Sequence, residues 1–330
     1  MPIVSVIIPT CNRTHYLQKA IDSVLGQSET DIEIIVVDDG SQDGTAQLVE
    51  KYTDIRVHYL HQENAGRSAA RNKGIRAAAG RFISFLDDDD VHCSSKIKTQ
   101  LAFLAAHPHI DAVASTGYLM DEHDNTQGIL APWKNLKEIT LPECIEQSGI
   151  PPSSLLLRRR SLDRMEYWFD QRLSYAEDND FVIRFLLSGH RLTWLPEPLW
   201  KYRRHSVRTG YMQLASVLSF HTVLERLFVR SDLAGSILEK KNEILSRSHT
   251  AIARFAYLHH MVKLGRYHLE MAVALDPLFL EDTPPRLSCN LSEFGHALSS
   301  DERERYCRCL CSNLPEPLLH LRPHLHEAMR

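Results

Sequence analysis

The stretch Phe82-Ile83-Ser84-Phe85-Leu86-Asp87-Asp88-Asp89-Asp90 decides the fold of this chain. Its first five residues form a short run that is aromatic and β-branched, which predicts a buried strand over 82–86. Four carboxylates follow at once, and each raises the pKa of its neighbours unless positive charge lies among them. A hard divalent cation, Mg²⁺ or Mn²⁺, is a natural neutraliser because such ions prefer oxygen ligands. The alternative is a solvated acidic turn.

The residues before this stretch alternate predicted strands with predicted helices. β-Branched runs predict strands at 4–8, 32–37 and 57–60, and apolar periodicity predicts helices at 16–27, 44–52 and 67–79. This alternation predicts a parallel sheet with helices on both faces, in which ligands bind at the carboxyl ends of the strands. Polar groups follow three of those ends, namely Pro9 to Arg13, Asp38-Asp39 and the four aspartates.

The rest of the chain changes in character toward its end. Apolar patterns predict strands at 111–118, 153–157 and 192–195, the last closed by Pro196-Glu197-Pro198, and a helix at 178–187. From about Met212 the pattern predicts helices only, at 214–230, 233–264 and 267–275. We therefore expect one α/β domain over 1–211 and a helical region over 212–330.

Composition and charge exclude several classes of protein. With 330 residues, 43% apolar and 24% charged, the chain has the make-up of an ordinary soluble globular protein. A net charge of −4 argues against a general nucleic-acid binder. The N-terminal run up to Pro9 lacks a basic segment, which indicates a strand and not a signal peptide. Seven unevenly spaced cysteines favour reduced thiols, so we expect a cytoplasmic protein.

Six motifs lie in order along the first two thirds of the chain, namely Val4–Arg13, Ile34–Ser41, Asn64–Gly66 with Ala69–Gly74, Phe85–Asp90, Glu177–Asp180 and Tyr202–His205. No G-x-G-x-x-G follows the first strand and no P-loop motif is present, which argues against two other nucleotide-binding folds. The order of the six motifs resembles that of the family 2 glycosyltransferases, which have the GT-A fold. The resemblance extends over about residues 3–210 and leaves the last third of the chain outside.

The resemblance implies a site for a nucleotide-sugar donor. In this family, the turn after the first strand and an Asp after the second hold the nucleobase, which points to Pro9, Thr10 and Asp39, with Asp38 as the alternative. Arg13 and Arg71 would supply positive charge for the phosphates or the nucleobase. The whole predicted donor set is Pro9, Thr10, Asn12, Arg13, Asp38, Asp39, Gly66, Arg71, Asp87 and Asp88.

The acidic run also implies a metal site of the D-x-D type. The family pattern corresponds to Asp87 and Asp89, with Asp89 as the first choice for Mn²⁺ or Mg²⁺ and Asp88 near the ribose. Asp90 is equally consistent with a helix cap. His205, in Tyr-Arg-Arg-His, is either a ligand of the metal or diphosphate, or a structural histidine.

The pair Glu177-Asp178 opens a predicted helix where the family keeps its catalytic base. We prefer Asp178 over Glu177 as the group that takes a proton from the acceptor hydroxyl. A desolvated carboxylate beside another acid is a stronger base than one in water. The alternative is two acids that complement the helix dipole.

The resemblance thus implies a metal-dependent, inverting glycosyltransferase. It would move a sugar, most readily from a UDP-sugar, to a hydroxyl of a glycan, lipid-linked or protein-linked acceptor. Donor binding would occupy about 1–110 and the acceptor side about 111–211. Peripheral membrane contact, and a homo-oligomer through the helices of 212–330, stay open. The alternative function is a non-catalytic, transferase-like scaffold whose helical tail recruits partners.

Overall fold

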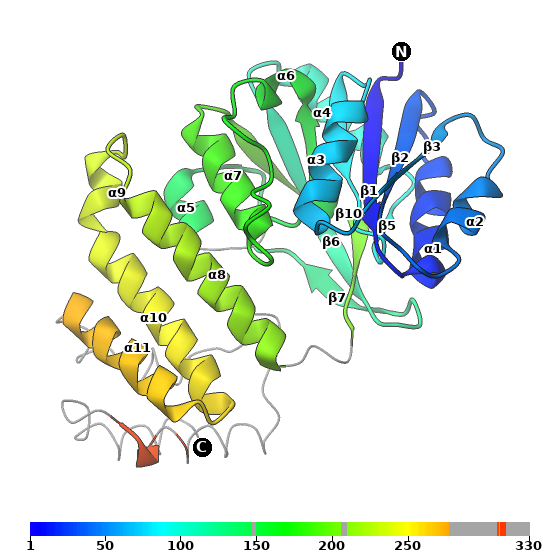
Figure 1. Cartoon of the computed structure of the whole chain (residues 1–330). Coiled ribbons are helices and arrows are strands. Elements are labelled where there is room, and N and C mark those ends of the chain that lie inside the picture. Colours follow the sequence, from blue (N-terminus) through cyan, green and yellow to red (C-terminus); the bar gives the residue numbers. More distant parts are fainter. Residues whose placement is uncertain (147–149, 206–209, 277–308, 310, 315–330) are drawn as a thin grey trace. The chain divides into compact units, whose positions relative to one another are not determined.

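The computed structural model describes residues 1–146, 150–205, 210–276, 309 and 311–314 (Figure 1). The chain divides into two compact units, Met1–Val207 and Arg208–Arg330. Among the described residues, no helix is both long enough and apolar enough to cross a bilayer.

The first unit is built on one mixed sheet. Its strands are β1 (Val4–Thr10), β2 (Ile32–Asp39), β3 (Val57–Gln62), β4 (Phe82–Phe85), β5 (Val91–His92), β6 (Ala112–Met120), β7 (Thr126–Leu130), β8 (Lys137–Ile139), β9 (Leu156–Arg158) and β10 (Leu192–Arg203). They lie in the order β3-β2-β1-β4-β9-β6-β10-β5, with β7 beside β6 and β8 beside β10. The first four strands are parallel, as is the β6–β10 pair, whereas β9 runs antiparallel to both its neighbours. The predicted α/β class is confirmed.

Helices cover both faces of this sheet because side chains alternate along each strand. Val4, Val6 and Ile8 of β1 belong to the core under one helical layer, and Ile7 faces the opposite layer. A Cβ at Gly74 would lie 2.3 Å from Ile7 Cγ2, so glycine is what lets its helix approach the sheet. The helices are α1 (Thr14–Leu25), α2 (Thr45–Glu50), α3 (Arg67–Ala77), α4 (Lys96–Ala106), α5 (Leu141–Glu146), α6 (Arg159–Leu162) and α7 (Glu177–Leu187).

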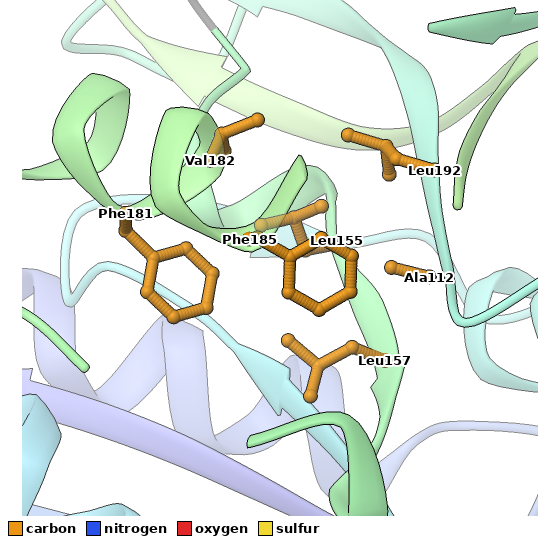
Figure 2. Close-up of a pocket in the computed structure, with 7 residues that line it drawn as sticks. All are labelled: Ala112, Leu155, Leu157, Phe181, Val182, Phe185 and Leu192. Atoms are coloured by element: carbon orange, nitrogen blue, oxygen red, sulfur yellow. The ribbon is translucent and has the colours of Figure 1, made fainter. Parts of the chain in front are cut away.

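Helix α7 rests on the sheet through an apolar contact. Phe181 and Phe185 point from α7 toward Leu155 and Leu157, as Figure 2 shows. The small pocket between them is lined by apolar side chains alone, so it offers nothing to a charged donor. The apolar packing around this pocket anchors α7, whose first turn carries Glu177 and Asp178.

Two predicted strands differ from the observed ones. The strand predicted to stop before Pro196 continues to Arg203, because both prolines lie where the β6–β10 register shifts. Proline has no N–H to donate and is tolerated at such irregularities. The strand predicted at 153–157 starts as a 3₁₀ turn, Pro152–Ser154, and only then becomes β9.

The second unit is helical in its described part, which confirms the predicted helical C-terminal region. The helix predicted at 233–264 is wrong: the structure has α9 (Gly235–Glu239), α10 (Lys241–Leu258) and the start of α11 (Val262–Leu275) there. The chain turns at His260, whose φ of 58° lies in the left-handed region. Helix α10 packs on α8 (Gly210–Phe228) and on α11, through Leu214, Val217, Ile252, Phe255 and Leu269. Residues 277–308 lie outside the described residues.

Candidate active site

Three strand ends meet at one edge of the sheet. Strand β1 lies between β2 and β4, and Thr10 at its end pairs with Asp38. The acidic run follows β4 directly. Pro9 lies beyond Ile7, the last β1 residue paired with β4, so its missing N–H costs no ladder bond on that side.

Asp38 and Asp39 are buried and bound to the surrounding loops. Asp38 accepts hydrogen bonds from the Ser41 N–H (2.8 Å) and the Tyr59 hydroxyl (2.6 Å). Asp39 accepts bonds from the N–H groups of Ala65 (2.9 Å) and Gly66 (2.8 Å), and from Gln62. The two carboxylates therefore fix the loops on either side of the β2 end.

Asn12 and Gly66 shape those loops. Asn12 donates its N–H to Ser41 Oγ (2.9 Å), and its side-chain oxygen accepts the N–H of Gln42 (2.7 Å). Its φ of 55° is a conformation that asparagine tolerates better than most residues. Gly66, with φ 88° and ψ 160°, enters α3 through a region that is essentially restricted to glycine.

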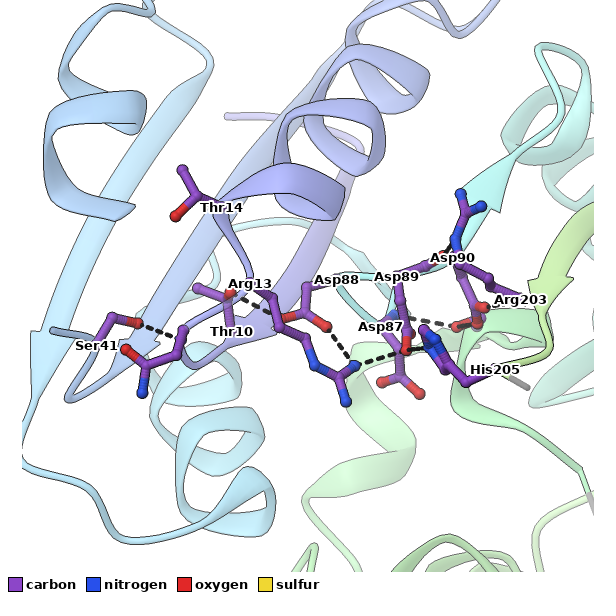
Figure 3. A network of polar contacts seen from close by, with 12 residues as sticks. Thr10, Arg13, Thr14, Ser41, Asp87, Asp88, Asp89, Asp90, Arg203 and His205 are labelled. Atoms are coloured by element: carbon purple, nitrogen blue, oxygen red, sulfur yellow. Dashed lines mark hydrogen bonds and ion pairs between the residues drawn. The ribbon is translucent and has the colours of Figure 1, made fainter. Parts of the chain in front are cut away.

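Asp88 and Asp89 share one arginine. Arg13 Nη1 lies 3.2 Å from Asp88 Oδ1 and 2.6 Å from Asp89 Oδ2, and Thr10 donates its hydroxyl to Asp88 (2.8 Å) (Figure 3). Burial raises the pKa of Asp88 to about 7. Burial opposes ionisation of Asp89, but His205 and Arg13 hold its pKa below the usual value. Asp89 is thus the member of this pair that ionises more readily.

His205 reaches the same carboxylate from β10. Its Nε2 lies 2.8 Å from Asp89 Oδ2, and its ring meets Tyr16 edge-on. Tyr16 in turn lies under the guanidinium of Arg203, 4.7 Å from it. His205 can be delivered there because β10 continues past its prolines.

Asp90 holds the site together and does not cap a helix. Its carboxylate accepts bonds from the Ser153 hydroxyl (2.7 Å) and the Arg203 N–H (3.0 Å). Burial raises its pKa well above the usual value. The next helix, α4, begins only at Lys96, so the capping alternative for Asp90 is wrong.

Arg71 joins the acidic run to α7. Its guanidinium lies 2.6 Å from Asp87 Oδ1 and 2.8 Å from Glu177 Oε1, and its side chain is 2% exposed. Burial alone would raise the pKa of Glu177, yet Arg71 and Arg67 beside it lower that pKa. Glu177 therefore stays ionised and bound.

Asp178 differs from its neighbour Glu177. Its carboxylate accepts the Asn179 N–H (2.9 Å), and within the described part of the chain it forms no ion pair with an arginine. Burial, together with the charge of Glu177, raises its pKa to about 6. The residue before the helix, Ala176, has φ 58°, a strained value for alanine that sets how the pair enters α7. A carboxylate with a pKa near neutrality is suited to accept a proton.

The side chains around Asp89 are suited to a divalent cation that is also bound by a substrate. Among the described residues, no three His, Cys, Asp or Glu side chains are grouped to hold a metal by themselves. Asp89 and His205 nevertheless bring an oxygen and a nitrogen to one point, 2.8 Å apart. Mg²⁺ commonly takes one or two carboxylates and completes its shell with substrate phosphates.

Sequence reasoning missed two supporting residues. Arg203 donates to the Asp89 and Asp121 carbonyl oxygens and pairs with Asp124, whereas the sequence pointed only to His205, two positions further on. Lys96 is fully buried, and burial lowers its pKa to about 7. Its amine donates to the side-chain oxygen of Gln100 (2.8 Å), and the Gln100 amide donates to the Ser154 carbonyl oxygen. Arg203 lies within the motif Tyr202–His205, which could have pointed to it, but nothing in the sequence marks Lys96 as buried.

Comparison with known proteins identifies the family. The chain matches "Glycosyl transferase family 2" over residues 5–165. It is 32% identical over 244 residues to an uncharacterised glycosyltransferase of Rickettsia prowazekii, covering 72% of each chain. The chain belongs to glycosyltransferase family 2. It is also 33% identical to the uncharacterised glycosyltransferase EpsJ of Bacillus subtilis, over 62% of this chain and 62% of EpsJ, which is less than two thirds of that relative.

Solved structures share the fold of this family 2 member. The TarS fragment 1–349 of S. aureus, in complex with UDP-GlcNAc, has a TM-score of 0.62 at 23% identity, covering 99% of this chain and 87% of that one. The mannosyltransferase PcManGT of Pyrobaculum calidifontis, in complex with GDP-Man and Mn²⁺, has a TM-score of 0.59 at 16% identity, covering 99% and 85%. At these identities the likeness establishes the fold alone.

Proposed function

We propose that this family 2 glycosyltransferase is inverting and metal-dependent. It transfers a sugar from a nucleotide-sugar donor, with a UDP-sugar as the first candidate, to a hydroxyl of a glycan, lipid-linked or protein-linked acceptor. The observation that carries the proposal is the position of Arg71. Arg71 pairs with Asp87 of the acidic run, where the donor would bind, and with Glu177, the neighbour of the proposed base. It therefore links the donor side of the site to the acceptor side.

The donor end would use the residues at the strand edge. Asp39 has oxygen lone pairs beyond those taken by its loop partners and can accept from a nucleobase N–H. Arg13 is half-exposed and can bind a phosphate in the bidentate manner of guanidinium groups. Asp89 and His205 would hold Mn²⁺ or Mg²⁺, which when bound stabilises the negative charge of the leaving diphosphate.

The acceptor end would use Asp178. Its raised pKa of about 6 leaves it ionised at neutral pH and basic enough to take the hydroxyl proton as the oxygen attacks the anomeric carbon. Glu177 stays paired with Arg71 and so acts as a positioning residue. A single displacement with one base inverts the anomeric configuration, because no covalent sugar intermediate is formed.

The named neighbours guide the choice of donor. TarS was crystallised with UDP-GlcNAc and the mannosyltransferase with GDP-Man and Mn²⁺, so UDP and GDP are the first nucleotides to test. A thermal-shift panel of nucleoside diphosphates with and without Mn²⁺ provides the test, since a ligand of the folded state raises apparent stability. Stabilisation by one nucleotide with metal is expected. No response to any nucleotide would refute the proposal.

We further propose that residues 1–211 carry donor binding and catalysis, and that 212–330 serve the acceptor or self-association. The described part of the second unit contains no acidic run like 87–90, and its helices pack mainly through apolar side chains. Removing 212–330 is then expected to leave nucleotide binding intact while changing acceptor use or oligomeric state. Loss of nucleotide binding by a folded 1–211 fragment would contradict this division.

A further inference from the structure

Arg13 and Arg71 approach the same acidic run but are held in different ways. Arg71 is 2% exposed and fixed between Asp87 and Glu177. Arg13 is 47% exposed and keeps one side in water while its Nη1 contacts Asp88 and Asp89. An arginine that is half-solvated gives up its protein partners at lower cost than a buried one, because water already solvates part of its charge and it is not left buried without a counter-charge.

The contact of Arg13 is made with one particular oxygen. Asp89 Oδ2 accepts from Arg13 Nη1 (2.6 Å) and also lies 2.8 Å from His205 Nε2. This is the oxygen that, in the function proposed above, would hold the divalent cation together with His205. A cation bound to this oxygen would lie next to the guanidinium, because both would contact the same atom. Two positive charges that close together repel strongly in a partly buried site. Arg13 and the cation therefore compete for Asp89.

We propose that Arg13 is a placeholder for the cation. Without metal, its guanidinium neutralises Asp88 and Asp89 and keeps the acidic run folded. When the donor arrives, Arg13 leaves Asp89 for the diphosphate, and Asp89 becomes available to the metal. The inference rests on the proposed metal-dependent function and adds a consequence to it: metal and donor load together, because neither gains its full set of contacts alone.

Binding measurements without turnover test the placeholder. Calorimetric titration of Arg13→Gln with Mn²⁺ alone is expected to show an affinity about tenfold higher than that of the wild type, since one charge-assisted hydrogen bond no longer competes. Titration with UDP alone is expected to show a loss of similar size, because the variant lacks the phosphate contact. A residue with a merely structural role would not shift the two affinities in opposite directions.

Two further variants serve as controls. Arg67→Gln also removes a half-exposed arginine near the site, 3.5 Å from Glu177, and is expected to leave the affinity for Mn²⁺ alone unchanged. Arg13→Lys keeps the charge without the forked geometry, and we expect a smaller gain in Mn²⁺ affinity. If circular dichroism shows that Arg13→Gln does not fold, the Mn²⁺ and UDP titrations of Arg13→Lys replace those of Arg13→Gln.

The outcomes separate this inference from the proposed function. If the wild type binds UDP more tightly with Mn²⁺ but neither Arg13 variant gains affinity for Mn²⁺ alone, the placeholder is refuted and the function stands. If the wild type shows no metal-dependent binding of UDP or GDP, the metal-dependent function fails and the placeholder fails with it. Equal gains in Arg13→Gln and Arg67→Gln would reduce the effect to net charge and also refute the placeholder.

Discussion

Arg71 Nη1 lies 2.8 Å from Glu177 Oε1, although 106 residues separate the two in the sequence. Both side chains are almost completely buried, and Asp87 satisfies the other end of the guanidinium. This bridge brings α3, the end of β4 and the first turn of α7 into one polar cluster. A buried ion pair contributes little net stability, but it fixes geometry because neither charge can be left alone.

Breaking this bridge is expected to destabilise the protein. Arg71→Met leaves the charge of Glu177 buried without its partner, which costs about 3–5 kcal/mol. Urea unfolding measures the loss. The double variant Arg71→Met with Glu177→Leu removes both charges and should recover much of it. No recovery in the double variant would show that Arg71 acts mainly through Asp87.

Replacing the proposed base is expected to stop turnover without affecting donor binding. Asp178→Asn keeps the shape of the side chain but removes the proton acceptor, so kcat should fall by about 10²–10⁴-fold. The Kd for nucleotide with Mn²⁺ should change little, since the contacts proposed for nucleotide and metal belong to Asp39, Arg13 and Asp89. Near-normal turnover would transfer the role of base to Glu177 or to the acceptor itself.

The pH profile provides a second check on Asp178. Its pKa of about 6 means that the carboxyl is protonated, and therefore inactive as a base, below that pH. The kcat of the wild type should accordingly rise with pH through about 6 and level off above it. In Asp178→Asn the residual rate should lack this acidic limb. A limb that persists in the variant would point to another titrating group.

Replacing the proposed metal ligand should give the opposite pattern. Asp89→Asn weakens the ligand at the point where His205 also converges, so the gain in nucleotide affinity on adding Mn²⁺ should be lost first. Titrations of nucleotide with and without Mn²⁺ measure that gain. Asp90→Asn is the matched comparison on the same run and should act on the unfolding temperature, since Asp90 binds Ser153 and the Arg203 backbone. Retention of the Mn²⁺ effect in Asp89→Asn would exclude Asp89 as a ligand.

The second unit is expected to lose stability in acid. His249 and His268 lie with their Nδ1 atoms 2.7 Å apart, and His221 packs on both. Burial, followed by the neighbouring histidines, lowers the pKa of His249 to about 3, and burial followed by His221 lowers that of His268 to about 4. The unfolded chain takes up protons near pH 6.5, whereas the folded cluster does not. Stability is therefore complete above that pH and declines as pH falls toward 3.

Thermal unfolding at pH 7 and pH 5 measures this decline. We expect the unfolding temperature to fall by roughly 5 °C or more, the shift that a change of about 1 kcal/mol produces in a unit of this size. His249→Gln should flatten the dependence, because a glutamine does not titrate. The same slope in the variant would assign the acid sensitivity to other groups, such as His221, whose pKa burial also lowers.

The sequence by itself determined the strands that end in polar residues and the candidate groups at those ends. Short β-branched runs bounded by turn residues, such as Ile34 to Val37, favour buried strands, and parallel strands bring their carboxyl ends to one edge. Neither conclusion requires knowledge of a long-range contact. The helical character of residues 210–275 also followed from local periodicity, although the breaks at Lys240 and His260 did not.

Only the tertiary structure decided which partners each acid has. Asp87 to Asp90 are chemically identical, and their differences come from partners far away in the chain: Arg71 for Asp87, Arg13 for Asp88 and Asp89, and Ser153 for Asp90. The same holds for Glu177, which pairs with Arg71, and for Asp178, which forms no ion pair with an arginine among the described residues. Charge, burial and pKa depend on these long-range neighbours, and a local sequence pattern carries no record of them.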